Sequence, residues 1–126
     1  MNVTKPMYSI TWHKPEKLLC LTWLEGTQGM TDEDFRETLE VFADSAIQHK
    51  AERLVIDVRQ FRHRPSPEVL KWRERVTVPK YNQAGTKRQA WIWPGDVSGM
   101  KSSTHAGSYE ERYFSTEEAA LAWLTE

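Results

Sequence analysis

A carboxylate and two histidines are the residues of this chain that could take part in acid–base catalysis. Asp57 ends an apolar, β-branched run typical of a central strand, whereas His63 and His105 lie in expected loops. Ligands of α/β sheets bind near the carboxyl ends of strands, so a small enzyme would need these residues in one cleft. No nucleophile elbow, phosphate loop or acid pair accompanies them. We therefore expect Asp57 to be structural, bonded to loop amides or to Arg59, and we expect no enzyme.

A basic cluster precedes the expected start of a helix at Ser66. Arg59, Arg62, His63 and Arg64 lie next to free helix amides, which add positive potential and could help to hold an anion. Surface arginines are more often solvated or paired with nearby carboxylates. The chain carries 17 basic and 18 acidic side chains, so its balanced charge offers no field for nucleic acid. We expect no nucleic-acid partner.

Six tryptophans are the most unusual feature of the 126-residue composition. Strand alternation places three aromatic or apolar sets each on one face: Tyr8, Ile10 and Trp12; Leu19, Leu21 and Trp23; Trp91 and Trp93. If helices cover the opposite side of the sheet, these sets leave an aromatic surface for a partner or an apolar ligand. If a helix covers them, they are core. A ligand pocket would be bordered by Trp72, Trp91 or Trp93, with residues 94–108 as its lid.

Histidine and cysteine usage predicts no metal and no cofactor. The histidines at positions 13, 49, 63 and 105 lack metal-ligand spacing. Cys20 is the single cysteine and lies in the apolar run 18–24, which favours a buried thiol and suits a reducing cytoplasm. Neither a signal-peptide core nor an apolar run long enough for a membrane span is evident. We therefore expect a cytoplasmic protein without a membrane span.

The elements that must position these residues form one α/β domain over 1–126. Strands are expected at 8–12 and 18–24, joined as an antiparallel hairpin, and at 53–59, 87–93 and 109–114. One helix is expected from the Thr31/Asp34 capping box to about residue 49, and another over 116–125 after a capping box at Ser115. Between them, a helix that starts at Ser66 is expected to be interrupted at Pro79, with another helical turn over 80–84 before Gly85 as an alternative. Residues 94–108 are expected to form a mobile loop. The result is a mixed sheet of about five strands, mainly parallel beyond the hairpin, with three to four helices.

The order and spacing of several motifs resemble the SpoIIAA-like proteins, which are small relatives of the STAS domain of sulfate transporters and anti-sigma factor antagonists. The motifs are the helix 35–47, Ile56-Asp-Val-Arg59, Ser66-Pro67, Val78-Pro79, Ala84-Gly85, the strand 88–94, Tyr113-Phe114 and Glu118-Ala-Ala-Leu-Ala-Trp-Leu124. The resemblance implies a STAS-like fold. In anti-sigma factor antagonists a serine at the start of the corresponding helix is phosphorylated, and Ser66 lies in a similar place. Its serine-proline context also suits an ordinary helix cap.

These observations favour a non-catalytic regulatory or binding module. It would act by self-association as a homodimer, through a protein partner, or by holding a small apolar or anionic ligand. The candidate ligand-binding residues are Asp57, Arg59, Arg62, His63, Trp72, Trp91 and Trp93. Two alternatives remain open: a partner-switching regulator phosphorylated at Ser66, and a small enzyme that uses Asp57 and His63.

Overall fold

One mixed sheet runs through the computed structural model, which describes residues 3–4, 6–100, 103–104 and 109–126. The strand order is β1-β2-β3-β4-β5-β7-β6. The bounds are β1 Val3–Thr4, β2 Tyr8–His13, β3 Leu18–Trp23, β4 Arg53–Asp57, β5 Arg88–Ile92, β6 Ser103–Thr104 and β7 Glu110–Phe114. Strands β2 and β3 form an antiparallel hairpin, and β3, β4, β5 and β7 are parallel neighbours. The predicted mixed α/β sheet is confirmed.

Two short strands at the sheet edges were not predicted. β1 pairs antiparallel with β2, and β6 pairs antiparallel with β7. β6 corrects the prediction of a loop over 94–108, because a two-residue strand is too short to leave a period-2 pattern in the sequence. The rest of the described part of that segment, residues 94–100, contains neither helix nor strand.

The helices are α1 Asp32–His49, α2 Pro67–Ala84 and α3 Glu117–Leu124, and a 3₁₀ helix, η1, spans Glu25–Gly29. The capping box of α1 is present as predicted: Asp34 N donates to Thr31 Oγ1 at 3.1 Å, and Thr31 N donates to Asp34 Oδ2 at 3.0 Å. At the start of α2, Val69 N donates to Ser66 Oγ at 3.2 Å. These caps satisfy amides that a helix N-terminus otherwise leaves unpaired.

Two helix predictions were wrong in detail. Pro79 does not interrupt α2, which continues to Ala84. A proline removes one helical amide donor, but the buried face formed by Thr77, Tyr81 and Ala84 anchors the helix on both sides of it. At α3, Thr116 rather than Ser115 is the cap, because Ala119 N donates to Thr116 Oγ1 at 3.1 Å.

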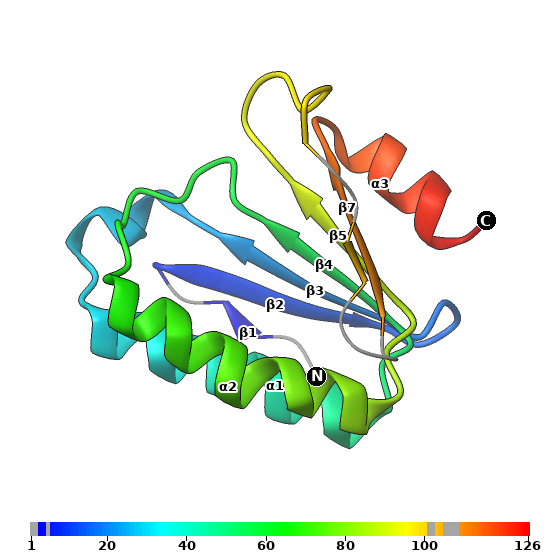
Figure 1. Ribbon diagram of the computed structural model, residues 1–126, viewed down its shortest axis with the longest axis horizontal. Helices are drawn as coiled ribbons and strands as arrows, with labels where there is room; N and C mark the ends of the chain where they lie inside the picture. The colour runs from blue at the N-terminus through cyan, green and yellow to red at the C-terminus, as the bar shows by residue number, and fades with distance from the viewer. Residues whose placement is uncertain (1–2, 5, 101–102, 105–108) are drawn as a thin grey trace.

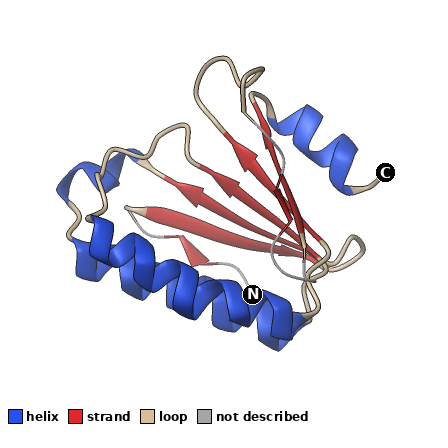
Figure 2. Cartoon of the chain, in the orientation of Figure 1, coloured by secondary structure: helices blue, strands red, loops and turns tan. Residues whose placement is uncertain are grey.

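The helices cover both faces of the sheet unequally. Figure 1 shows α1 and α2 side by side on one face, and α3 alone on the other face near β5 and β7. Figure 2 shows the same three layers coloured by secondary structure. The core under α3 consists of Leu18, Val55, Ala90, Ile92, Ala120, Trp123 and Leu124. The larger core lies between the sheet and the helix pair.

The aromatic residues of β2 and β3 face the helix pair, so of the two alternatives for these strands the structure favours core over an open aromatic surface. Tyr8, Ile10, Leu19, Leu21 and Trp23 are buried in the core that α1 and α2 complete. Trp23 is only 2% exposed, and its ring stacks on Phe35 of α1 at 5.6 Å between centroids. The predicted homodimer stays a prediction, and these side chains of β2 and β3 are not available for its interface.

Candidate functional site

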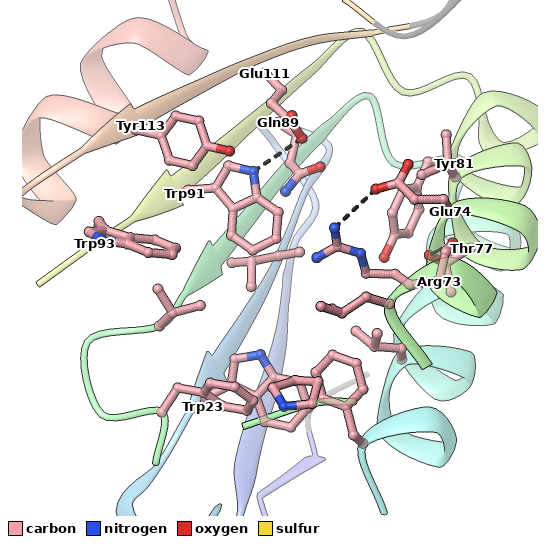
Figure 3. Close-up of a pocket in the computed structure, with 18 of the residues that line it drawn as sticks. Trp23, Arg73, Glu74, Thr77, Tyr81, Gln89, Trp91, Trp93, Glu111 and Tyr113 are labelled. Carbon is pink, nitrogen blue, oxygen red and sulfur yellow. Dashed lines mark hydrogen bonds and ion pairs between the residues drawn. The ribbon is translucent and has the colours of Figure 1, made fainter. Parts of the chain in front are cut away.

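A pocket of about 460 Å³ lies between α2 and the helix-facing side of β4, β5 and β7. Figure 3 shows side chains from the sheet and from α2 that point toward this space from opposite sides. Eight aromatic residues contribute to the wall: Trp23, Phe35, Phe61, Tyr81, Trp91, Trp93, Tyr109 and Tyr113. Five polar or charged residues join them: Arg73, Glu74, Thr77, Gln89 and Glu111.

Strand alternation and parallel register build the sheet side of this pocket. In β5, Ala90 and Ile92 belong to the core under α3, so Gln89 and Trp91 face the opposite side. The parallel pairing of β5 with β7 places Gln89 opposite Glu111 and Trp91 opposite Tyr113. The rings of Trp91 and Tyr113 are nearly parallel, with 12° between their planes and 6.2 Å between their centroids.

Trp91 is held in place from two directions. Its Nε1 donates to Glu111 Oε2 at 3.1 Å, and the guanidinium carbon of Arg73 lies 5.8 Å from the centre of its ring. Arg73 Nη2 also pairs with Glu74 Oε1 at 3.0 Å. Figure 3 shows both hydrogen-bonded pairs. Trp91 and Arg73 thus form facing walls from the sheet and from α2.

The deep wall of the pocket is polar and closed to solvent. Gln89 is 1% exposed, and its Nε2 has no hydrogen-bond partner among the described residues. Thr77 is fully buried, and its Oγ1 donates to Arg73 O at 2.7 Å. Burial raises the pKa of Tyr81 and of Tyr109, so both phenols stay neutral at physiological pH.

The pocket mouth combines apolar residues with Glu74, whose side chain is 51% exposed. Leu70 of α2 and Trp93, just after β5, are each 36% exposed, and both contribute to the lining. Trp93 also contacts Tyr113 edge to face, with 5.9 Å between ring centroids. Pro94 is the one described residue of the predicted lid segment that lines the pocket, whereas residues 101–102 and 105–108 of that segment lie outside the described residues.

The candidate residues of the sequence analysis do not form one site. Trp91 and Trp93 line the pocket, but Trp72 lies outside the lining, with the guanidinium of Arg36 at 5.5 Å from its ring. Asp57 follows the alternation of Val55 toward the α3 side of the sheet. The pairing expected for Asp57 is present: Arg59 Nη2 lies 2.7 Å from its Oδ2, and Arg59 N donates to Oδ1 at 3.0 Å.

His63 and Ser66 share a partner that the sequence analysis overlooked. Asp32 Oδ1 lies 2.9 Å from His63 Nε2 and accepts from Ser66 N at 3.3 Å. Hydrogen bonds from Ser66 and then from His63 hold the pKa of Asp32 below its ordinary value. This cluster joins the starts of α1 and α2.

Because His63 bonds Asp32 and Asp57 bonds Arg59, the acid–base pair of the enzyme hypothesis is not assembled; His105 lies outside the described residues.

The remaining candidates have structural surroundings. Arg62 is exposed, and its backbone amide donates to Oγ1 of the buried Thr27 at 2.8 Å. Cys20 packs against the core under α3, and burial raises the pKa of its thiol to about 11, which keeps it protonated at neutral pH. Within the described ranges, no helix is long and apolar enough to cross a membrane.

Sequence reasoning missed all five polar or charged pocket residues, namely Arg73, Glu74, Thr77, Gln89 and Glu111. One signal was available. A glutamine followed directly by the apolar strand residues Ala90, Trp91 and Ile92 is unusual, because buried polar side chains are rare without a partner. The other four meet Gln89 only in the tertiary structure. The register of β5 against β7 places Glu111 beside it, and the position of α2 brings the three helix residues to the pocket.

Comparison with known proteins agrees with this architecture. A family model described as SpoIIAA-like matches residues 21–125, which include the second half of β3, the strands β4 to β7, all three α-helices and the whole pocket lining. Searches of curated proteins and of solved structures gave no significant match. Because the family match spans most of the chain and agrees with the observed fold, this protein belongs to the SpoIIAA-like family.

Proposed function

We propose that this SpoIIAA-like domain is a non-catalytic binding module that holds a small, largely apolar molecule between α2 and β4, β5 and β7. The observation that carries the proposal is the pocket of about 460 Å³ with its aromatic wall. Small-molecule sites typically have volumes of about 300–1,000 Å³, mostly apolar walls and a few convergent polar groups. Membership of the SpoIIAA-like family, which indicates a regulatory STAS-type module, agrees with binding rather than chemistry.

The titratable groups around the pocket support a binding role. Glu111 accepts a hydrogen bond from Trp91, and Glu74 pairs with Arg73. Burial keeps the phenols of Tyr81 and Tyr109 protonated. A general acid or base works best when its pKa is near the operating pH, and these two phenols are shifted away from it. The two carboxylates orient Trp91 and Arg73, and together with the phenols they give the aromatic wall its polar positions.

The first experiment is native mass spectrometry of freshly purified protein, combined with titration of the apolar fluorophore 1-aminoanthracene. We expect either a retained small molecule or saturable fluorophore binding with one site per chain. Trp91→Ala removes a pocket wall and should weaken fluorophore binding at least about fivefold, since an aromatic contact of this size is worth about 1 kcal/mol or more.

Trp72→Ala is the matched control, because Trp72 is also half-buried on the helix side but lies outside the pocket lining. This variant should bind the fluorophore within about twofold of the native protein, a difference of less than 0.5 kcal/mol. Equal loss in both variants, or no binding to the native protein at any soluble concentration, would contradict the proposal. Circular dichroism of each variant verifies that it is folded.

A further inference from the structure

We infer that the ligand of this pocket carries an uncharged hydrogen-bond acceptor, such as a ketone or amide oxygen, that enters first and meets the side-chain amide of Gln89. The inference rests on the proposed binding function and names its ligand class. Its basis is the buried polar side chain of Gln89. Gln89 and Thr77 are buried in the pocket wall, whereas Leu70, Trp93 and Glu74 are the exposed residues of the lining.

The unpaired amide of Gln89 is the main observation. Most buried polar atoms in proteins have a hydrogen-bond partner, and leaving one without a partner is unfavourable. Gln89 Nε2 is buried and unpaired among the described residues, and the side chain lines the pocket. The backbone of Gln89 is fixed between Leu54 of β4 and Glu111 of β7. The side chain therefore stays in the pocket wall, and because its Nε2 is closed to solvent in the ligand-free protein, the terminal amide must turn about χ3 to meet a ligand atom that supplies the partner.

The charges of the lining favour a neutral ligand head. Among the described lining residues, the formally charged side chains are Arg73, Glu74 and Glu111, which sum to one negative charge. Arg73 is already paired with Glu74 at 3.0 Å. A carboxylate on the ligand would meet an excess of negative charge in a poorly solvated space, which is unfavourable. A carbonyl oxygen accepts the hydrogen bond of Gln89 without adding charge.

The body of the ligand is expected to be planar. The nearly parallel rings of Trp91 and Tyr113, with Trp93 edge-on to Tyr113, offer a flat aromatic wall. Aromatic rings pack well in offset-stacked and edge-to-face contacts, so a conjugated or aromatic ring system fits this wall. Taken together, these features describe an aromatic ketone, amide or similar compound whose oxygen points inward and whose apolar end faces Leu70.

The test compares three probes of nearly the same shape as competitors of 1-aminoanthracene. They are 2-acetylnaphthalene with a neutral acceptor, 2-ethylnaphthalene with none, and 2-naphthoate with an anion. A hydrogen bond to an otherwise unpaired buried amide should make the ketone bind about tenfold more tightly than the hydrocarbon. The naphthoate should bind more weakly than the ketone. In ¹⁵N-labelled protein, the side-chain amide resonances of Gln89 should shift with the ketone and not with the hydrocarbon.

Gln89→Met tests the assignment to this residue. It keeps the length of the side chain and removes the amide, so the ketone and the hydrocarbon should bind alike. Gln83→Met is the matched control, since Gln83 is exposed on α2 and outside the lining. This control should keep the tenfold preference.

The outcomes separate the inference from the proposed function. If the native protein binds the ketone and the hydrocarbon equally well, or binds the naphthoate most tightly, the inference is overturned while the binding function stands. If 1-aminoanthracene and all three probes fail to bind, the proposed function fails and the inference fails with it. The comparison within the native protein decides the question even if Gln89→Met does not fold.

Discussion

Replacing Gln89 with methionine should stabilise the ligand-free fold. The native side chain is 1% exposed, and its Nε2 lacks a hydrogen-bond partner among the described residues. An unsatisfied buried polar group costs about 1–3 kcal/mol relative to a paired one. Methionine has a similar length and volume and adds no polar atom, so the replacement should leave little cavity or strain. Allowing for up to about 1 kcal/mol of repacking cost, we expect the free energy of unfolding to rise by about 1–2 kcal/mol.

Urea unfolding followed by circular dichroism measures this change. The transition midpoint should move to higher urea concentration with an unchanged slope, because the surface exposed on unfolding is nearly the same. The thermal midpoint should rise by about 4–8 °C, given roughly 4 °C per kcal/mol for a domain of this size. The exposed Gln83→Met substitution should change stability by less than about 0.5 kcal/mol.

A destabilised Gln89→Met protein would refute the reasoning, because it would mean that the amide already contributes to the fold. The effect of ligand gives an independent check. A saturating acceptor ligand should stabilise the native protein more than it stabilises the variant, since stabilisation by a ligand depends on its affinity for the folded state. A Gln89→Met variant that is more stable without ligand and binds the ligand more weakly would show that both effects come from the same buried amide.

Three further predictions concern stability. Thr27→Val should cost about 1–3 kcal/mol in urea unfolding because the buried hydroxyl is both donor and acceptor, whereas the exposed Thr125→Val should cost less than half as much. Ser66→Ala should cost about 1 kcal/mol as a lost helix cap, and Ser115→Ala should change stability by less than 0.5 kcal/mol; equal effects would contradict the assigned caps. Burial lowers the folded-state pKa of His49, so its contribution to stability is present above about pH 6.5 and is lost as the pH falls below that value. His49→Gln should reduce the difference in unfolding free energy between pH 7.5 and pH 5.5, and an unchanged difference would count against this assignment.

Local signals explain why much of the fold was predictable. The capping box at Thr31 and the serine cap at Ser66 act within one helical turn, so the sequence contains all of their partners. The same holds for the alternation within β5, which separates Ala90 and Ile92 from Trp91. Each of these depends on residues a few positions apart.

Tertiary packing decided the features that matter for function. The sequence showed that aromatic residues share faces of the strands, but the side on which α1 and α2 pack determined that Trp23 is core and Trp91 a pocket wall. The packing of α2 on the sheet also kept this helix continuous through Pro79 and brought Arg73 over the ring of Trp91. Alternation in a strand fixes which residues share a face and leaves open which face a distant helix will cover. The sequence by itself therefore determined most of the elements and which residues share a face, and the long-range packing of the helix pair decided that the buried Gln89 would lie in a pocket wall.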